Sequence, residues 1–152
     1  MESLPVQRLV PTAQLPARAH RGDAGADLCT TIDLVLEPHA RVLAPTGIAV
    51  AIPHGYVGLI HPRSGLAYRQ GLTVLNTPGT IDAGYRGEIR VLLYNADSGT
   101  TIRLAAGERI AQLVIVPVAL PSFHEVSTLD QTDRGSGGFG STGMTMEESA
   151  RR

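Results

Sequence analysis

The sequence predicts an all-β fold of the sandwich, jelly-roll or barrel type. Glycine (17) and proline (10) are spread along the 152 residues, and such residues divide a chain into many short segments, as in proteins built from strands. The segments between them are rich in Val, Ile, Leu and Thr, and only residues 64–70 have the pattern of a helical turn. Hydrophobic residues make up 43% of the chain, so we expect one domain with a substantial core.

The expected strands follow one another with short connections. They span residues 6–10, 26–36, 41–43, 48–52, 56–60, 72–75, 88–94, 102–104 and 110–118. The clearest alternation places Ile89, Val91 and Leu93 on one face of a strand. Residues 110–118 are almost continuously apolar, which is typical of a buried strand.

The charged residues exclude several mechanisms. All 13 cationic side chains are arginine, so neither a Schiff-base lysine nor a lysine-containing phosphate loop is possible. A cation that binds an anion must therefore be a guanidinium, which suits bidentate contacts to phosphate. The net charge of −1 gives no electrostatic case for nucleic acid as a partner.

The number of cysteines and the length of the apolar runs limit which disulfides, metal sites and membrane segments the chain can form. Cys29 is the single cysteine, so no internal disulfide and no Cys-x-x-Cys zinc site can form; we expect it to be a small core residue. The N-terminus does not look like a signal peptide, and no apolar run is long enough for a membrane span. We expect a soluble cytoplasmic protein without a membrane partner. The five histidines lack metal-ligand spacing and are assigned no role.

Two polar stretches in the first half of the chain could carry chemistry. In GDAGADL, Asp23 and Asp27 either make ordinary turns or act on a divalent cation, directly or through water. HPRSGLA at residues 61–67 combines a guanidinium, a hydroxyl and the N–H groups that begin a helical turn. These groups suit an anion, although a serine there can also serve simply as the helix N-cap.

Two further stretches lie in the second half. LNTPGTIDAGYRGEI at residues 75–89 is expected to form a hairpin whose backbone, with Asn76, could present donors and acceptors to a planar base edge; an ordinary hairpin is the alternative. In GERIAQL at residues 107–113, Gln112 lies within an apolar strand, where a buried amide must find partners.

The last segment, residues 127–152, has few large apolar side chains and no periodicity. It contains RGSGGFGSTG at 134–143. One interpretation is a disordered tail. The other is a functional arm, because an arginine, an aromatic ring and adjacent hydroxyls are groups that bind phosphate and stack on a base.

In order along the chain, these stretches resemble the five motifs of the homotrimeric dUTPases. They read AGADL (24–28), PRSGLA (62–67), NTPGTIDAGYRGEI (76–89), GERIAQL (107–113) and RGSGGFGSTG (134–143). Thr77 stands where the family more often has serine. The resemblance implies a distorted jelly roll (β-clip) with one short helix. It also implies a β core over residues 1–126 and a flexible C-terminal arm over 127–152.

The same resemblance implies Mg²⁺-dependent hydrolysis of dUTP to dUMP and pyrophosphate by water attack on the α-phosphorus. This activity limits uracil incorporation into DNA and supplies dUMP for thymidylate synthesis. Asp82 matches the residue that orients and deprotonates the water, as a general base must. Asp27 matches the residue that holds the metal through coordinated water, in keeping with the reluctance of Mg²⁺ to lose its hydration shell.

The resemblance also assigns the substrate contacts. Asn76 would read the uracil edge, and Tyr85 would pack under the deoxyribose and exclude a 2′-hydroxyl. The residues that would bind the phosphates or close over the nucleotide are Arg63, Ser64, Gly65, Gln112, Arg134, Phe139, Gly140, Ser141 and Thr142. Among these, Phe139 would stack on the uracil. Each site would be shared within a homotrimer, with the arm supplied by a neighbouring subunit.

Two other functions are compatible with the pattern. One is a dCTP deaminase or its bifunctional relative, which shares the β fold and the triphosphate contacts. The other is a non-catalytic nucleotide-binding trimer. The TIDAGYRG and FGSTG sequences favour hydrolysis of dUTP over the deaminase, and the presence of Asp82, Asp27 and Arg63 argues against the non-catalytic trimer.

Overall fold

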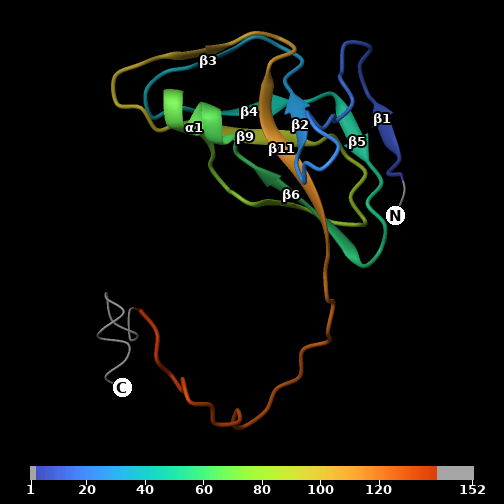
Figure 1. Cartoon of the computed structure of the whole chain (residues 1–152), viewed down its shortest axis with the longest axis vertical. Helices are drawn as coiled ribbons and strands as arrows, with labels where there is room; N and C mark the ends of the chain where they lie inside the picture. Colours follow the sequence, from blue (N-terminus) through green and yellow to red (C-terminus); the bar gives the residue numbers. More distant parts are fainter. Residues whose placement is uncertain (1–2, 140–152) are drawn as a thin grey trace. The chain divides into compact units, whose positions relative to one another are not determined.

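The computed structural model describes residues 3–139 and is mostly β, as predicted (Figure 1). The chain divides into two compact units, Met1–Leu120 and Pro121–Arg152. The described part contains β1 (Val6–Arg8), β2 (Ala26–Cys29), β3 (Leu34–Leu36), β4 (Arg41–Pro45), β5 (Ile48–Val50), β6 (Tyr56–His61), α1 (Ser64–Gln70), β7 (Leu72–Val74), β8 (Gly79–Ile81), β9 (Arg90–Asn95), β10 (Ile102–Leu104) and β11 (Arg109–Pro117). The bounds of α1 are those expected from the sequence.

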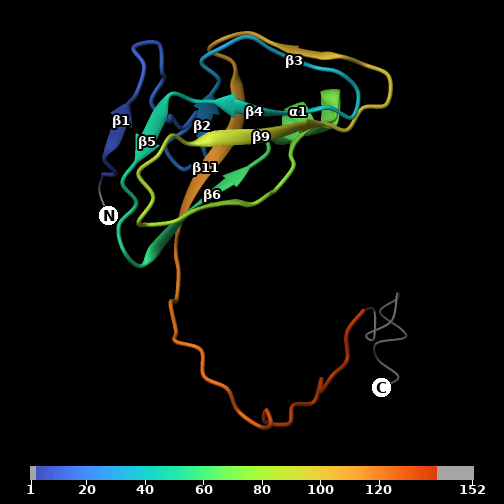
Figure 2. The same cartoon turned by 180° about the vertical axis from the view of Figure 1, so that it is seen from behind.

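Every strand pair in the first unit is antiparallel. The largest sheet has the order β2-β11-β6-β8, and a second sheet has the order β4-β9-β7. Two-stranded ladders, β1-β5 and β3-β10, complete the unit. β11 and β9 each lie in the interior of a sheet and run past one another in Figures 1 and 2.

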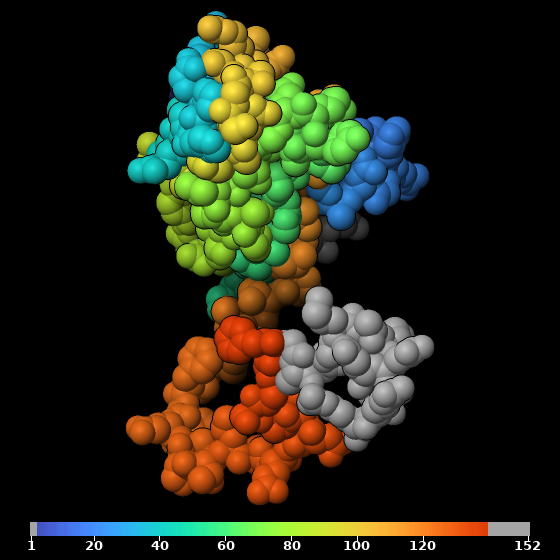
Figure 3. All heavy atoms as spheres, turned by 90° about the vertical axis from the view of Figure 1, so that its left-hand side faces the viewer, coloured from blue at the N-terminus to red at the C-terminus, as the bar shows by residue number. Residues whose placement is uncertain are grey.

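The core lies between these sheets and is built from aliphatic side chains. Ile89, just before β9, and Val91 and Leu93 within it are each at most 1% exposed. The predicted alternation of buried side chains is confirmed, although the strand begins at Arg90 and not at residue 88. Figure 3 shows the close packing of the first unit, with the segments of β3 (cyan) and β10 (gold) in contact as their ladder requires.

Two segments differ from the expectation. The apolar run 26–36 forms two strands, β2 and β3, which pair with different partners, β11 and β10. The stretch 75–89 does not form a hairpin of paired arms. Its β8 pairs with β6 in the larger sheet, whereas β7 before it pairs with β9 in the other sheet. The stretch is therefore a connection between two sheets, and its polar residues line a pocket.

In the second unit, residues 121–139 contain neither helix nor strand. A tight turn is present where the backbone N–H of Gly135 bonds to the carbonyl of Thr132, and the Arg134 guanidinium donates to the carbonyl of Gly137. Within residues 3–139, no helix is long and apolar enough to cross a membrane.

Candidate active site

A buried carboxylate, Asp27, is surrounded by donors from three elements. Arg63 Nε lies 3.1 Å from its Oδ1, Gln112 Nε2 lies 3.4 Å from the same oxygen, and Arg109 Nη1 lies 3.0 Å from Oδ2. The Asp27 side chain is 9% exposed, against 24% for Arg63 and 53% for Arg109. We call Asp27, Arg63, Arg109 and Gln112 the arginine–aspartate cluster.

The sheet register explains how the cluster forms. Gln112 on β11 stands opposite Asp27 on β2 and also opposite His61 on β6. Arg63 follows the end of β6, so its side chain reaches back over the same face. Two guanidinium groups and one carboxylate carry a formal charge of +1, and such a surplus of fixed N–H donors suits a phosphate.

The cluster continues into the first turn of α1. Arg63 is the N-cap residue, with an extended backbone and no side-chain cap, so Ser64 is the first helical residue and not the cap. This contradicts the simple N-cap alternative for Ser64. The first N–H groups of a helix have no acceptor within it, and those of Ser64 and Gly65 follow directly after Arg63. A Cβ on Gly65 would come within 3.1 Å of the Arg69 guanidinium, so glycine leaves room there.

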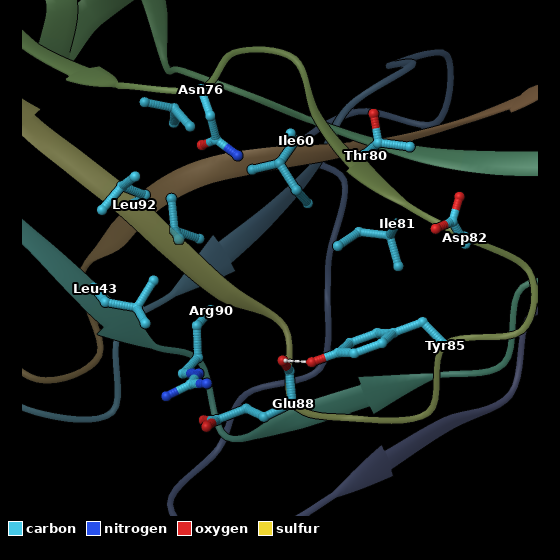
Figure 4. Close-up of a pocket in the computed structure, with 13 residues that line it drawn as sticks. Leu43, Ile60, Asn76, Thr80, Ile81, Asp82, Tyr85, Glu88, Arg90 and Leu92 are labelled. Atoms are coloured by element: carbon cyan, nitrogen blue, oxygen red, sulfur yellow. Dashed lines mark hydrogen bonds between the residues drawn. The ribbon is translucent and has the colours of Figure 1, made fainter.

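A second group of predicted residues surrounds a pocket of about 290 Å³, shown in Figure 4. Asn76, Asp82 and Tyr85 line it together with Glu88 and Arg90; Asn76 lies across the pocket from Glu88 and Arg90, and Tyr85 lies beside Glu88. Its floor is apolar and includes Ile60, Ile81 and Leu92. Apolar side chains combined with an amide, a carboxylate and a phenol in one pocket can hold a planar ring and its sugar.

Contacts around the pocket hold its wall in place. The Tyr85 hydroxyl donates to the backbone carbonyl of Glu88 at 2.9 Å, as Figure 4 shows. The Glu88 carboxylate in turn accepts the backbone N–H of Gly47 at 2.8 Å. Gly79 lies beneath Asn76, since a Cβ on Gly79 would come within 3.3 Å of Asn76 Nδ2.

Asp27 of the cluster and Asp82 of the pocket lie at opposite edges of the larger sheet. Asp27 lies on β2, and Asp82 follows β8 at the other end of the order β2-β11-β6-β8. Asp27 is in register with His61 on β6, whereas Ile81 is in register with Gly58. Three strand spacings of about 4.8 Å and about four residues of rise place the two aspartates roughly 20 Å apart.

The remaining predicted residues fall in other places. Arg134 and Phe139 lie in the second unit, with the Phe139 side chain fully exposed. Gly140, Ser141 and Thr142 lie outside the described residues. Asp23 makes turn contacts, accepting the backbone N–H of His20 at 2.8 Å, which confirms the turn interpretation for that aspartate.

Arg109 is a member of the cluster that the sequence did not indicate. A bulge in β11 accounts for this, because the register with β2 passes from Arg109 opposite Cys29 to Ala111 opposite Leu28. Cys29 itself is buried, as expected, and burial raises the pKa of its thiol, with the Asp27 charge adding to the effect.

The acceptor capacity of Asp27 decides whether the residue fits a magnesium ion. Within residues 3–139, no group of three or more His, Cys, Asp or Glu residues could hold a metal alone. A carboxylate offers about four lone-pair sites, and the cluster occupies three, two on Oδ1 and one on Oδ2. One site on Oδ2 remains for a water of a hydrated Mg²⁺, so the residue fits a metal held mainly by water and substrate phosphates.

Comparison with known proteins shows the family of the chain. A family model described as dUTPase matches residues 12–143. The chain is 61% identical over 143 residues to the deoxyuridine 5′-triphosphate nucleotidohydrolase of Nocardia farcinica, covering 94% of this chain and 87% of that protein. It is 58% identical over 146 residues to the protein of the same name from Mycolicibacterium gilvum, covering 93% and 95%.

Solved structures show the same fold. A mutant dUTPase of Staphylococcus bacteriophage 80alpha with dUpNHpp superposes with a TM-score of 0.88 at 34% identity, covering 95% of this chain and 100% of that chain. A mutant dUTPase from phage phi11 of S. aureus, described with a structural Mg(II) ion, gives a TM-score of 0.80 at 32% identity, with 86% and 100% covered.

Proposed function

The chain belongs to the dUTPase family, and we infer from this that it hydrolyses dUTP to dUMP and pyrophosphate. The predicted family, its jelly-roll fold and its enzymatic class are thereby confirmed. The activity removes a precursor of uracil in DNA and supplies dUMP. One observation supports the assignment of this activity to the site residues. The chain has both a pocket of the size of a base beside Asp82 and a cluster of N–H donors suited to phosphate around Asp27.

In the proposed mechanism, Asp82 orients a water and accepts its proton while the water attacks the α-phosphorus. The carboxylate stands at the margin of the pocket, where it can face a nucleotide bound by Asn76 and Tyr85. The pyrophosphate leaving group takes up negative charge, and donors arranged beforehand stabilise such charge most effectively. Arg63, Ser64, Gly65 and Gln112 supply those donors.

Magnesium is proposed as the cofactor, with Asp27 contacting it through water. When bound, the ion neutralises charge on the phosphate oxygens and thereby favours attack. The protein's part is to present the remaining acceptor site of Asp27 Oδ2 in a fixed direction while Arg63 binds a phosphate through its other N–H groups.

Selectivity is proposed to lie in the pocket. Asn76 provides both a donor and an acceptor for the uracil edge, and the confined wall leaves little room for a thymine methyl group. The Tyr85 ring, held by its bond to the Glu88 carbonyl, would occupy the space that a 2′-hydroxyl requires. Both effects reject a wrong substrate by steric clash.

A homotrimer with shared sites is proposed for two reasons. First, the roughly 20 Å between Asp82 and Asp27 of one chain is too long for a water on one to reach a phosphate held beside the other. Second, β6 and β11 leave an apolar strip half-buried, with Val57 opposite Val116 and Leu59 opposite Val114. A second copy over this strip would cover it and bring a pocket to the cluster.

The arm is proposed to complete the site of a neighbouring copy. Arg134 would contact phosphate and Phe139 would stack on the uracil, a contact worth about 1–3 kcal/mol per base in related stacking. The predicted division into a core over residues 1–126 and an arm over 127–152 remains part of this proposal, as does a cytoplasmic location.

One assay tests the function. The protein is incubated with Mg²⁺ and dUTP, dCTP, dTTP or UTP, and pyrophosphate and ammonia are measured. Pyrophosphate from dUTP in large preference to the other nucleotides is expected. Ammonia from dCTP would support the deaminase alternative, and the absence of product from every nucleotide would support a binding module.

A further inference from the structure

Arg109 lies on the same face of β11 as Gln112, although the two are three residues apart. In a regular strand such residues point to opposite faces. Here the register gains one residue between Arg109 and Ala111, so Arg109 stands opposite Cys29 while Gln112 stands opposite Asp27. Cys29 and Asp27 share a face of β2, and the bulge therefore turns Arg109 toward the carboxylate. Bulges commonly redirect a side chain in this way beside active sites.

The extra residue is Ile110, which is 1% exposed and packs in the core. Without the bulge, strand alternation would send Ile110 to the cluster and Arg109 to the core. The structure thus keeps an apolar side chain buried and a charged one at the carboxylate. This arrangement serves both packing and the placement of the guanidinium.

The two arginines hold different ends of the same carboxylate. Arg63 contacts Oδ1 and Arg109 contacts Oδ2, and Arg63 Nη1 also donates to the Arg109 carbonyl at 3.4 Å. Under the proposed function Arg63 also binds a phosphate, so its N–H donors are divided between Asp27 and the substrate. Arg109 contacts Oδ2, which accepts no other hydrogen bond from residues 3–139, and this contact fixes the direction of the second lone pair of Oδ2.

We propose that Arg109 is a positioning residue that holds Asp27 in the orientation required to receive the hydrated magnesium–nucleotide complex. The proposal rests on the proposed function and adds a residue to it. Arg109 acts through Asp27 and needs no contact of its own with the substrate. Partners that orient a metal-binding group typically contribute about 10- to 100-fold to metal affinity or activity.

The test compares Arg109→Gln and Arg109→Lys with a matched control, Arg103→Gln. Arg103 is exposed on β10 and lies outside the cluster and the pocket, so the control removes the same charge without touching either. Turnover of dUTP is measured across a range of Mg²⁺ concentrations. Binding of dUpNHpp is measured by calorimetry with and without Mg²⁺, which provides a readout that does not depend on turnover.

We expect Arg109→Gln to weaken Mg²⁺-dependent binding of dUpNHpp by about 10- to 100-fold and to raise the Mg²⁺ concentration needed for half-maximal turnover. Arg109→Lys should recover part of both losses, because an ammonium keeps the charge but not the fixed fork of donors. Arg103→Gln should match the wild-type protein in both measurements.

The decisive comparison is made in an Asp27→Asn background. If Arg109 acts through Asp27, Arg109→Gln should add no further loss of analogue binding there. An independent loss in that background, or wild-type behaviour of Arg109→Gln, would overturn the proposal. So would a loss of binding equal with and without Mg²⁺, which would make Arg109 a direct phosphate ligand. Failure of the wild-type protein to hydrolyse dUTP would instead reject the proposed function. The binding measurements would still show whether Arg109 acts through Asp27.

Discussion

The hydroxyl of Tyr85 donates a 2.9 Å hydrogen bond to the backbone carbonyl of Glu88, and this bond closes the chain around Gly87. A Cβ on Gly87 would clash with the Tyr85 hydroxyl oxygen. The hydrogen bond of its hydroxyl holds the ring in place, and the lack of a side chain at Gly87 leaves the space that the hydroxyl occupies. Its position at the pocket wall depends on both residues.

Replacement of Tyr85 should change the choice between dUTP and UTP. We expect Tyr85→Phe to keep most of the discrimination, because the ring remains. Tyr85→Ala should raise kcat/KM for UTP relative to dUTP by about 10- to 100-fold, since removal of a steric block is worth a few kcal/mol at most. The ratio of the two kcat/KM values measures the effect. An unchanged ratio in Tyr85→Ala would show that the ring does not exclude the 2′-hydroxyl.

Replacement of Asp82 by asparagine should separate chemistry from binding. The amide keeps the size of the side chain but cannot accept the proton of the attacking water, so we expect turnover to fall by about 10²- to 10⁴-fold. Calorimetric affinity for dUpNHpp should stay within a few-fold of the wild-type value. Equal losses of affinity and turnover would argue against a role as general base.

Local patterns predicted much of the fold. The strand with Val91 and Leu93 and the short helix after Arg63 were both predicted, because alternation and turn chemistry depend on neighbours in sequence. The pairing of β8 with β6 was not, because nothing within residues 75–89 specifies which of two sheets the segment joins. A hairpin was therefore expected where the chain in fact crosses between sheets.

The candidate site shows the same limit. Asp27, Arg63 and Gln112 were found through motifs that resemble a known family, and the structure brings these three together. Arg109 lies within one of those motifs and was still missed. Its orientation depends on a bulge, and a bulge is a property of the register between two strands. No pattern in β11 alone distinguishes it from a regular strand.

Removal of the arm should reduce activity without unfolding the core. The first compact unit ends at Leu120, so deletion of residues 134–152 leaves its packing intact. We expect an unchanged urea midpoint and an unchanged oligomeric state, with kcat/KM for dUTP reduced by about 5- to 150-fold through the loss of the stacking contribution alone. Deletion of residues 144–152 is the matched control, because it retains RGSGGFGSTG. Full activity after the longer deletion would show that the segment is only a tail.

Asn95 should be a determinant of stability and not of catalysis. Its side chain is 0% exposed, and its Nδ2 donates to the carbonyls of Leu36 and Thr100 at 3.0 and 2.8 Å. Its Oδ1 accepts the backbone N–H of Asp97 at 2.9 Å. Asn95→Leu would leave these two carbonyls and this N–H group without partners. Each buried group that loses its partner lowers the free energy of unfolding by about 1–3 kcal/mol. Urea denaturation should therefore show a loss of about 2–5 kcal/mol, whereas Gln7→Ala, at an exposed position of β1, should remain within about 0.5 kcal/mol of wild type.

Asp97 should contribute to stability in a pH-dependent way. Backbone N–H groups of Gly99 and Thr100 donate to its carboxylate at 2.9 and 2.7 Å. These bonds lower the pKa of Asp97 below the ordinary value of 3.8, and the bond from Gly99 has the larger effect. Because the folded state favours the ionised form, this contribution is present above the pKa of the unfolded chain. It is lost as pH falls through the lower pKa of the folded state.

The measurement is the urea midpoint of wild type and Asp97→Asn from pH 7 to pH 2. Both N–H groups donate to Oδ1, so the amide oxygen of the variant can accept both bonds. The amide does not titrate, and the midpoint of the variant should therefore fall less than that of wild type below about pH 4. The other carboxylates contribute equally to both proteins, and the difference between the two curves therefore isolates Asp97. Parallel curves through this range would mean that the two backbone bonds stabilise the neutral and ionised forms equally, and the pKa of Asp97 would then not be lowered on folding.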